Sequence, residues 1–187
     1  MLRSRFEWSI LIVIVVLLGA AWIFDSRETV VENKNFLLTE APIVGHYAPD
    51  FTAVTVDGES YTLTDFVNRD GVGGQPVVLN FWASWCGPCR IEMPHFERAS
   101  LNYSGRAAIL GINQAESGET VAKFGQNTRV TYPLLVDEDM TLNRQYGVAN
   151  LPTTIFVDRE GVIREVFVGT MNQAVLENKI DGLLQQQ

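Results

Sequence analysis

Cysteine and histidine are scarce in this chain of 187 residues, which holds two of each. No third cysteine competes with the pair, and a zinc site of four ligands would need both cysteines together with His46 and His95. Basic residues are also few, since 14 Lys and Arg stand against 22 Asp and Glu. The net charge of −8 argues against nucleic acid as a partner, because phosphate binding needs a basic face.

Internal repeats and low-complexity tracts are absent too, while 47% of the residues are apolar. A chain of this length and composition can bury the core of one domain and carry an additional segment.

The additional segment is an uncharged apolar stretch near the amino terminus. Residues 10–24 hold no charge, and Trp8 extends the stretch to about 17 residues, near the lower limit for crossing a bilayer. Arg3 and Arg5 precede it and favour a cytoplasmic amino terminus. We therefore expect a cytoplasmic segment (1–7), a single transmembrane anchor (8–24), a tether (25–46) and a domain outside the cytoplasm (47–187), on the periplasmic or outer face of the membrane.

A cleaved signal peptide is the alternative interpretation of this segment. The small residues Gly19, Ala20 and Ala21 resemble a cleavage site, although the apolar run continues through residues 22–24. Both interpretations place the domain outside the cytoplasm.

The rest of the chain alternates predicted strands and helices. A β-hairpin is expected around the turn Asp57-Gly58, and a second around residues 158–161. The expected elements are strands at 76–81, 107–113, 133–136, 153–157 and 162–168, and helices at 86–103, 119–126, 140–146 and 172–184. The last helix is amphipathic, with one apolar side: Val175, Leu176, Ile180, Leu183 and Leu184. This order predicts an α/β sandwich with a mixed sheet flanked by helices.

The two cysteines lie three positions apart, in Cys86-Gly87-Pro88-Cys89, where a predicted strand passes into a helix. The first amides of a helix and its dipole favour a thiolate, so we expect a pKa below about 8.5 for Cys86. Cys89 follows one turn later on the same face and can displace whatever Cys86 binds. Pro88 is tolerated in the first helical turn, and the pattern predicts thiol–disulfide exchange.

Other uses of the pair remain open at this point. A purely structural disulfide closing so short a loop would constrain the unfolded chain by only about 2 kcal/mol. A zinc half-site and a copper(I) site of two thiolates are further alternatives.

The segment from Val78 to Pro94 resembles the active-site segment of the thioredoxin superfamily, especially its membrane-anchored TlpA/ResA/CcmG-like branch. The opening 48–51 and the segments 132–137 and 147–156 match as well. The resemblance implies a thioredoxin-like fold with an N-terminal β-hairpin, a cis peptide bond before Pro152 facing the thiols, and no cofactor.

The resemblance also implies roles for side chains around the thiols. Cys86 and Cys89 form the redox-active disulfide, and Glu92 is expected to exchange a proton with Cys89, an exposed helix carboxylate being the alternative. A client peptide would bind a surface made by these residues: Trp85, Gly87, Pro88, Leu151 and Pro152. Asn80 stands where cytosolic thioredoxins keep a buried aspartate, and an amide cannot titrate.

By this resemblance the chain is a protein-disulfide reductase recharged by a membrane electron donor of the CcdA/DsbD type. Its substrates would be disulfide-containing proteins. By analogy with this branch, one such substrate would be the haem-binding cysteine pair of apocytochrome c. A peroxiredoxin-like thiol peroxidase is one alternative, although Ala83 replaces the threonine expected three positions before the reactive cysteine. A copper(I) chaperone or adaptor without enzymatic activity is the other.

Overall fold

The computed structural model describes residues 8, 13–18, 39–70 and 72–185. These belong to two units, residues 1–38 and residues 39–187. Residues 13–18 are helical, and among the described residues no helix is long and apolar enough to cross a membrane. The predicted cytoplasmic segment, most of the predicted anchor and the first part of the tether lie outside the described residues.

The second unit begins at Thr39, eight residues before the predicted start of the domain. Residues 39–46, which the sequence analysis places in the tether, pack on the domain through main-chain hydrogen bonds. Gly45 N–H donates to the carbonyl of Ile163 over 2.8 Å, and Ala41 N–H donates to Tyr47 over 3.0 Å. An ion pair of 2.5 Å joins Glu40 to Arg69.

Twelve elements are resolved in this unit, close to the predicted ranges. The strands are β1 (Thr52–Val54), β2 (Ser60–Thr62), β3 (Val77–Trp82), β4 (Ala108–Gln114), β5 (Leu134–Asp137), β6 (Thr153–Val157) and β7 (Ile163–Val168). The helices are the 3-10 helix η2 (Leu63–Asp65), α2 (Gly87–Asn102), α3 (Gly118–Thr128), α4 (Thr141–Gln145) and α5 (Gln173–Gln185).

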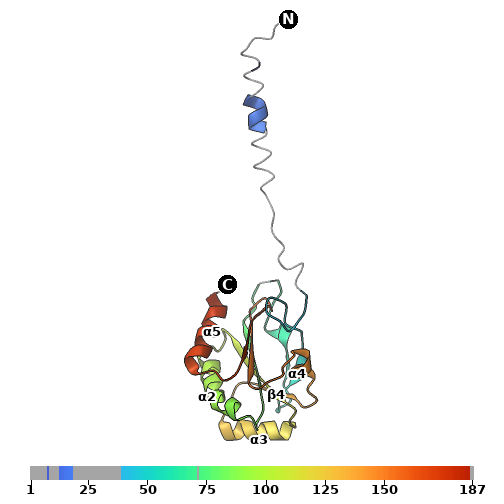
Figure 1. The fold of residues 1–187 in the computed structure, drawn as a ribbon, viewed down its shortest axis with the longest axis vertical. Helices are drawn as coiled ribbons and strands as arrows, with labels where there is room; N and C mark the ends of the chain where they lie inside the picture. Colours follow the sequence, from blue (N-terminus) through green and yellow to red (C-terminus); the bar gives the residue numbers. More distant parts are fainter. Residues whose placement is uncertain (1–7, 9–12, 19–38, 71, 186–187) are drawn as a thin grey trace. The chain divides into compact units, whose positions relative to one another are not determined.

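The central sheet is mixed, with the strand order β5-β4-β3-β6-β7. Strand β3 pairs parallel with β4 and antiparallel with β6, while β1 and β2 form the predicted N-terminal hairpin. Helices α2 and α5 lie on one side of the sheet and α4 lies on the other (Figure 1). The arrangement is the predicted thioredoxin-like α/β fold with helices flanking a mixed sheet.

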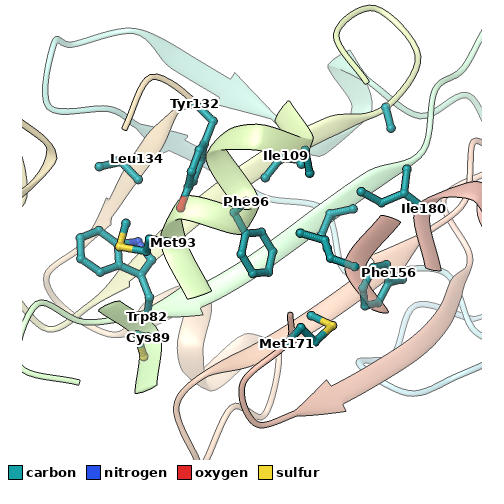
Figure 2. Close-up of a cluster of buried hydrophobic side chains, with 14 of the residues drawn as sticks. Trp82, Cys89, Met93, Phe96, Ile109, Tyr132, Leu134, Phe156, Met171 and Ile180 are labelled. Carbon is teal, nitrogen blue, oxygen red and sulfur yellow. The ribbon is translucent and has the colours of Figure 1, made fainter. Parts of the chain in front are cut away.

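Strand β3 is buried on both faces, and its alternation sorts its side chains into two apolar clusters. Val78 and Trp82 face the cluster formed with α2 and α5, whereas Val77, Leu79 and Phe81 face the cluster formed with α4 and the hairpin. Figure 2 shows the first cluster, where Met93 and Phe96 lie near Trp82. Asn80 has the same parity as Val78 and Trp82, so its amide points toward α2.

Helix α5 departs from the prediction at one position. Leu176, Ile180 and Leu183 are buried as expected, but Val175 is exposed. The buried residues follow one another after four positions and then after three, so the buried apolar stripe of α5 is narrower than the predicted one.

Candidate active site

The cysteine pair lies where β3 ends and α2 begins. Cys86 and Cys89 form a disulfide with a Cα–Cα distance of 5.3 Å. Cys86 is the N-cap of α2, and its sulfur accepts a hydrogen bond of 3.2 Å from the main-chain N–H of Cys89. This is the position where a serine or threonine oxygen normally caps a helix, and here the sulfur accepts the Cys89 amide at the start of the helix.

The two sulfurs have different surroundings. Cys89 is completely buried, on the inner stripe of α2. Cys86 is 5% exposed, and the residues on either side of it, Trp85 and Gly87, are exposed. Trp85 has 67% of its surface exposed, as expected for a docking residue, whereas Trp82 is fully buried and its ring lies 5.0 Å from that of Phe124.

The peptide bond between Leu151 and Pro152 is cis, as the resemblance implied. Pro152 is buried, and its carbonyl accepts a hydrogen bond of 2.9 Å from Gly169. Among the described residues, the main-chain N–H and C=O of Leu151 have no main-chain partner. Those groups are therefore free to pair with another strand.

Glu92 is fully buried, so the alternative of an exposed helix carboxylate is wrong. Its carboxylate accepts hydrogen bonds of 2.9 Å from the Asn80 side chain and 3.0 Å from the main-chain N–H of Met171. Burial raises the pKa of Glu92 to about 7, because desolvation outweighs the two hydrogen bonds, which act to lower it. The group can thus take up or release a proton near neutral pH.

The hydrogen bond between Asn80 and Glu92 was not predicted from the sequence. The Asn80 amide also donates to Thr154 Oγ1 over 3.2 Å, across the pairing of β3 with β6. A sequence signal for this burial does exist, because Glu92 falls on the same helical stripe as Cys89, Met93 and Phe96.

Metal-binding residues do not gather in the described part of the chain, where no three His, Cys, Asp or Glu side chains lie close enough to hold an ion.

A disulfide-bonded Cys-x-x-Cys pair at a helix N-terminus, a buried acid on the same helix and a cis-proline are typical of a thioredoxin-like thiol–disulfide oxidoreductase. Residues 44–166 match the AhpC/TSA family model, and the chain belongs to that family.

Named relatives agree with this assignment. The chain is 39% identical over 140 residues to the thioredoxin-like protein YneN of Bacillus subtilis, an alignment that covers 73% of this chain and 78% of that protein. It is 34% identical over 152 residues to the thiol-disulfide oxidoreductase ResA of Geobacillus thermodenitrificans, which covers 80% of this chain and 83% of ResA.

A solved structure shows the same fold. The exposed lipoprotein thioredoxin Etrx1 of Streptococcus pneumoniae superposes with a TM-score of 0.60 at 28% identity, over 72% of this chain and 99% of Etrx1.

Proposed function

We propose that this protein is a membrane-anchored, extracytoplasmic reductant of protein disulfides. The observation that carries the proposal is the unequal access to the two sulfurs. Cys86 keeps 5% of its surface exposed beside the exposed Trp85, while Cys89 has no exposed surface. In this proposal an incoming disulfide meets the exposed part of Cys86, because Cys89 offers none.

The reaction follows from this order of access. The Cys86 thiolate attacks one sulfur of the substrate disulfide, and the other substrate sulfur leaves as a thiolate and takes up a proton. Cys89 then loses its proton and attacks Cys86 Sγ, which releases the second substrate thiol. Two electrons have passed to the substrate, and the pair Cys86–Cys89 is left as a disulfide.

Glu92 accepts the proton that Cys89 loses. It follows Cys89 by three positions on the same face of α2, where side chains of adjacent turns meet. With a pKa of about 7, the carboxylate is a sufficiently strong base at neutral pH and can return the proton when the pair is reduced again.

The client surface in this proposal combines Trp85, Gly87 and Pro88 with the main chain of Leu151. Trp85 supplies exposed apolar area, and the free main-chain groups of Leu151 would pair with an extended client segment.

The surroundings of the enzyme follow from the amino-terminal segment and from the redox chemistry. The apolar residues 8–24, preceded by Arg3 and Arg5, support an anchor with the domain outside the cytoplasm. A reductant that works in an oxidising compartment needs a supply of electrons, which a membrane donor of the CcdA/DsbD type would provide.

The cysteine pair of apocytochrome c is the proposed substrate. Release of the full chain from membranes by alkaline extraction would contradict the anchor.

Trapping tests the proposed order of attack. Cys89→Ser cannot resolve the mixed disulfide and should accumulate covalent adducts with client proteins, visible on non-reducing gels. Cys86→Ser is the matched control and should trap none, because Cys89 has no exposed surface, whereas Cys86 keeps 5%. Equal trapping by both variants, or none by Cys89→Ser, would contradict the proposal.

A further inference from the structure

Glu116 is an acidic residue outside the thiol motif that contacts the active-site turn. Its carboxylate accepts a hydrogen bond of 2.7 Å from the main-chain N–H of Ser84 and another from Ser84 Oγ. A third, also of 2.7 Å, comes from the Asn113 side chain. Both carboxylate oxygens thus accept hydrogen bonds, from Ser84 just after β3 and from Asn113 near the end of β4.

The backbone directs Glu116 to this place. Strand β4 ends beside the end of β3, with Asn113 opposite Trp82. The next residue after β4, Ala115, has a φ of +58°, which is uncommon for a residue with a side chain. Its N–H donates to the carbonyl of Asp137 over 3.1 Å, and α3 starts three residues later. Such strained residues gather at functional sites, because surrounding contacts must maintain them.

The turn held by Glu116 carries the reactive cysteine. Cys86 N–H donates to the carbonyl of Ala83 over 3.2 Å, which closes a turn with Ser84 and Trp85 at its centre. A displacement of this turn would therefore change the position of Cys86 Sγ relative to the first amides of α2, together with that of the exposed Trp85.

We propose that Glu116 is a positioning residue for Cys86. Its carboxylate fixes the turn from Ala83 to Cys86 by accepting both hydrogen bonds of Ser84, and so aligns Cys86 Sγ with the amides of α2. The inference rests on the proposed function in one respect, that Cys86 is the attacking sulfur.

Glutamine and alanine at position 116 separate hydrogen bonding from charge. A glutamine carbonyl can accept from Ser84 N–H and Asn113, which both bond to Oε2 of Glu116, while its amide can donate to Ser84 Oγ. Glu116→Gln therefore keeps the contacts and loses the charge, whereas Glu116→Ala loses both. Glu119→Ala is the matched control, because Glu119 is an exposed acid in the first turn of α3.

The test measures the pH profile of iodoacetamide alkylation of Cys86 in the reduced full-length proteins. Glu116→Ala should raise the pKa of the Cys86 thiol, because the sulfur loses its alignment with the helix amides. Glu116→Gln and Glu119→Ala should not raise it. A purely electrostatic role predicts the opposite sign, since removing a negative charge would lower the thiol pKa in both position-116 variants, and that result would overturn the proposal.

A second measurement uses reduction of the uncharged disulfide hydroxyethyl disulfide by the same proteins. The rate constant of Glu116→Ala should fall about ten-fold, and Glu116→Gln should recover to within about two-fold of the parent protein. A glutamine variant as slow as the alanine variant would overturn the hydrogen-bonding role. If Glu116→Ala fails to fold by circular dichroism, Ser84→Ala, which removes only the hydroxyl donor, should show a smaller rise of the Cys86 pKa, and no rise would overturn the proposal.

Failure of the proposed function would give a different experimental result from failure of the role proposed for Glu116. A parent protein that does not reduce the disulfide contradicts the proposed function, whereas the order of the alkylation pKa values tests Glu116 without any turnover.

Discussion

Glu92 is a carboxyl group in a place that the fold otherwise fills with apolar side chains. It stands on the stripe of α2 that buries Cys89, Met93 and Phe96, and desolvation keeps its pKa near 7. A residue that is costly to bury in its charged form is retained here by two hydrogen bonds, from Asn80 and from the main chain of Met171. The cost has a measurable dependence on pH.

Glu92→Gln should remove a pH-dependent loss of stability. The folded protein binds the Glu92 proton more tightly than the unfolded chain, because the pKa is raised from 4.5 to about 7. The free energy of unfolding contributed by this group is therefore highest below pH 4.5, falls as the pH rises, and is about 3 kcal/mol lower above pH 7. Urea unfolding of both oxidised proteins at pH 4.5 and pH 8 checks this.

The comparison uses the difference between the two proteins, so other titrating groups cancel. The glutamine variant can lose one hydrogen bond, which shifts its stability equally at both pH values. Its stability relative to the parent should rise by about 3 kcal/mol between pH 4.5 and pH 8. An unchanged difference would show that Glu92 is not held in the raised-pKa environment.

At the scale of elements, β4 must approach its neighbours closely at one point. Gly111 lies in the middle of β4, and a Cβ there would come within 2.8 Å of Leu134 Cδ2 and 3.0 Å of Trp82 Nε1. Glycine is required at this position because a side chain would collide with these atoms. Backbone conformation is not the reason, since the φ of Gly111 is not positive. The close packing keeps Trp82 and Tyr132 beside α2.

Gly111→Ala should destabilise the domain by about 1–3 kcal/mol, since the methyl group overpacks a filled site. Gly182→Ala is the control, because Gly182 lies in α5 and a Cβ there meets nothing within 4 Å. Replacing that helical glycine should stabilise the protein by up to about 1 kcal/mol. Chemical denaturation of the two variants should thus give shifts of opposite sign, and shifts of the same sign would contradict the packing argument.

At the scale of the whole molecule, both apolar clusters lie in the unit that begins at Thr39. The disulfide, Glu92, the cis-proline and Glu116 belong to the same unit. We therefore expect residues 39–187 to fold and to carry out the chemistry without residues 1–38.

A fragment of residues 39–187 should fold and reduce disulfides at the rate of the full chain. A fragment of residues 47–187 should be less stable by about 1–3 kcal/mol, because it lacks hydrogen bonds such as that from Gly45 to Ile163. Thermal and urea unfolding of the two fragments measure the difference. Equal stabilities would show that residues 39–46 contribute nothing to the domain.

Prediction from the sequence succeeded where the signal is local. The buried strand predicted at residues 76–81, the turn at Asp57-Gly58 and the spacing of Cys86 and Cys89 each extend over a few residues, and each appears in the structure as expected. The cis bond before Pro152 was predicted only through the family resemblance, because cis bonds are rare among X–Pro bonds. The packing of residues 39–46 on the domain was not predicted, since it includes a hydrogen bond from Gly45 to the distant Ile163.

The sequence by itself determined that two thiols meet at the start of a helix, because strand and helix periodicities and a three-residue spacing act locally. Only the tertiary structure decided the surroundings of those thiols. Asn80 reaches Thr154 across 74 positions, and Glu92 reaches Met171 across 79, so both contacts depend on strand register and helix packing. Glu116 likewise reaches Ser84 only because β4 ends beside β3 and Ala115 turns the chain back, which no short-range pattern specifies.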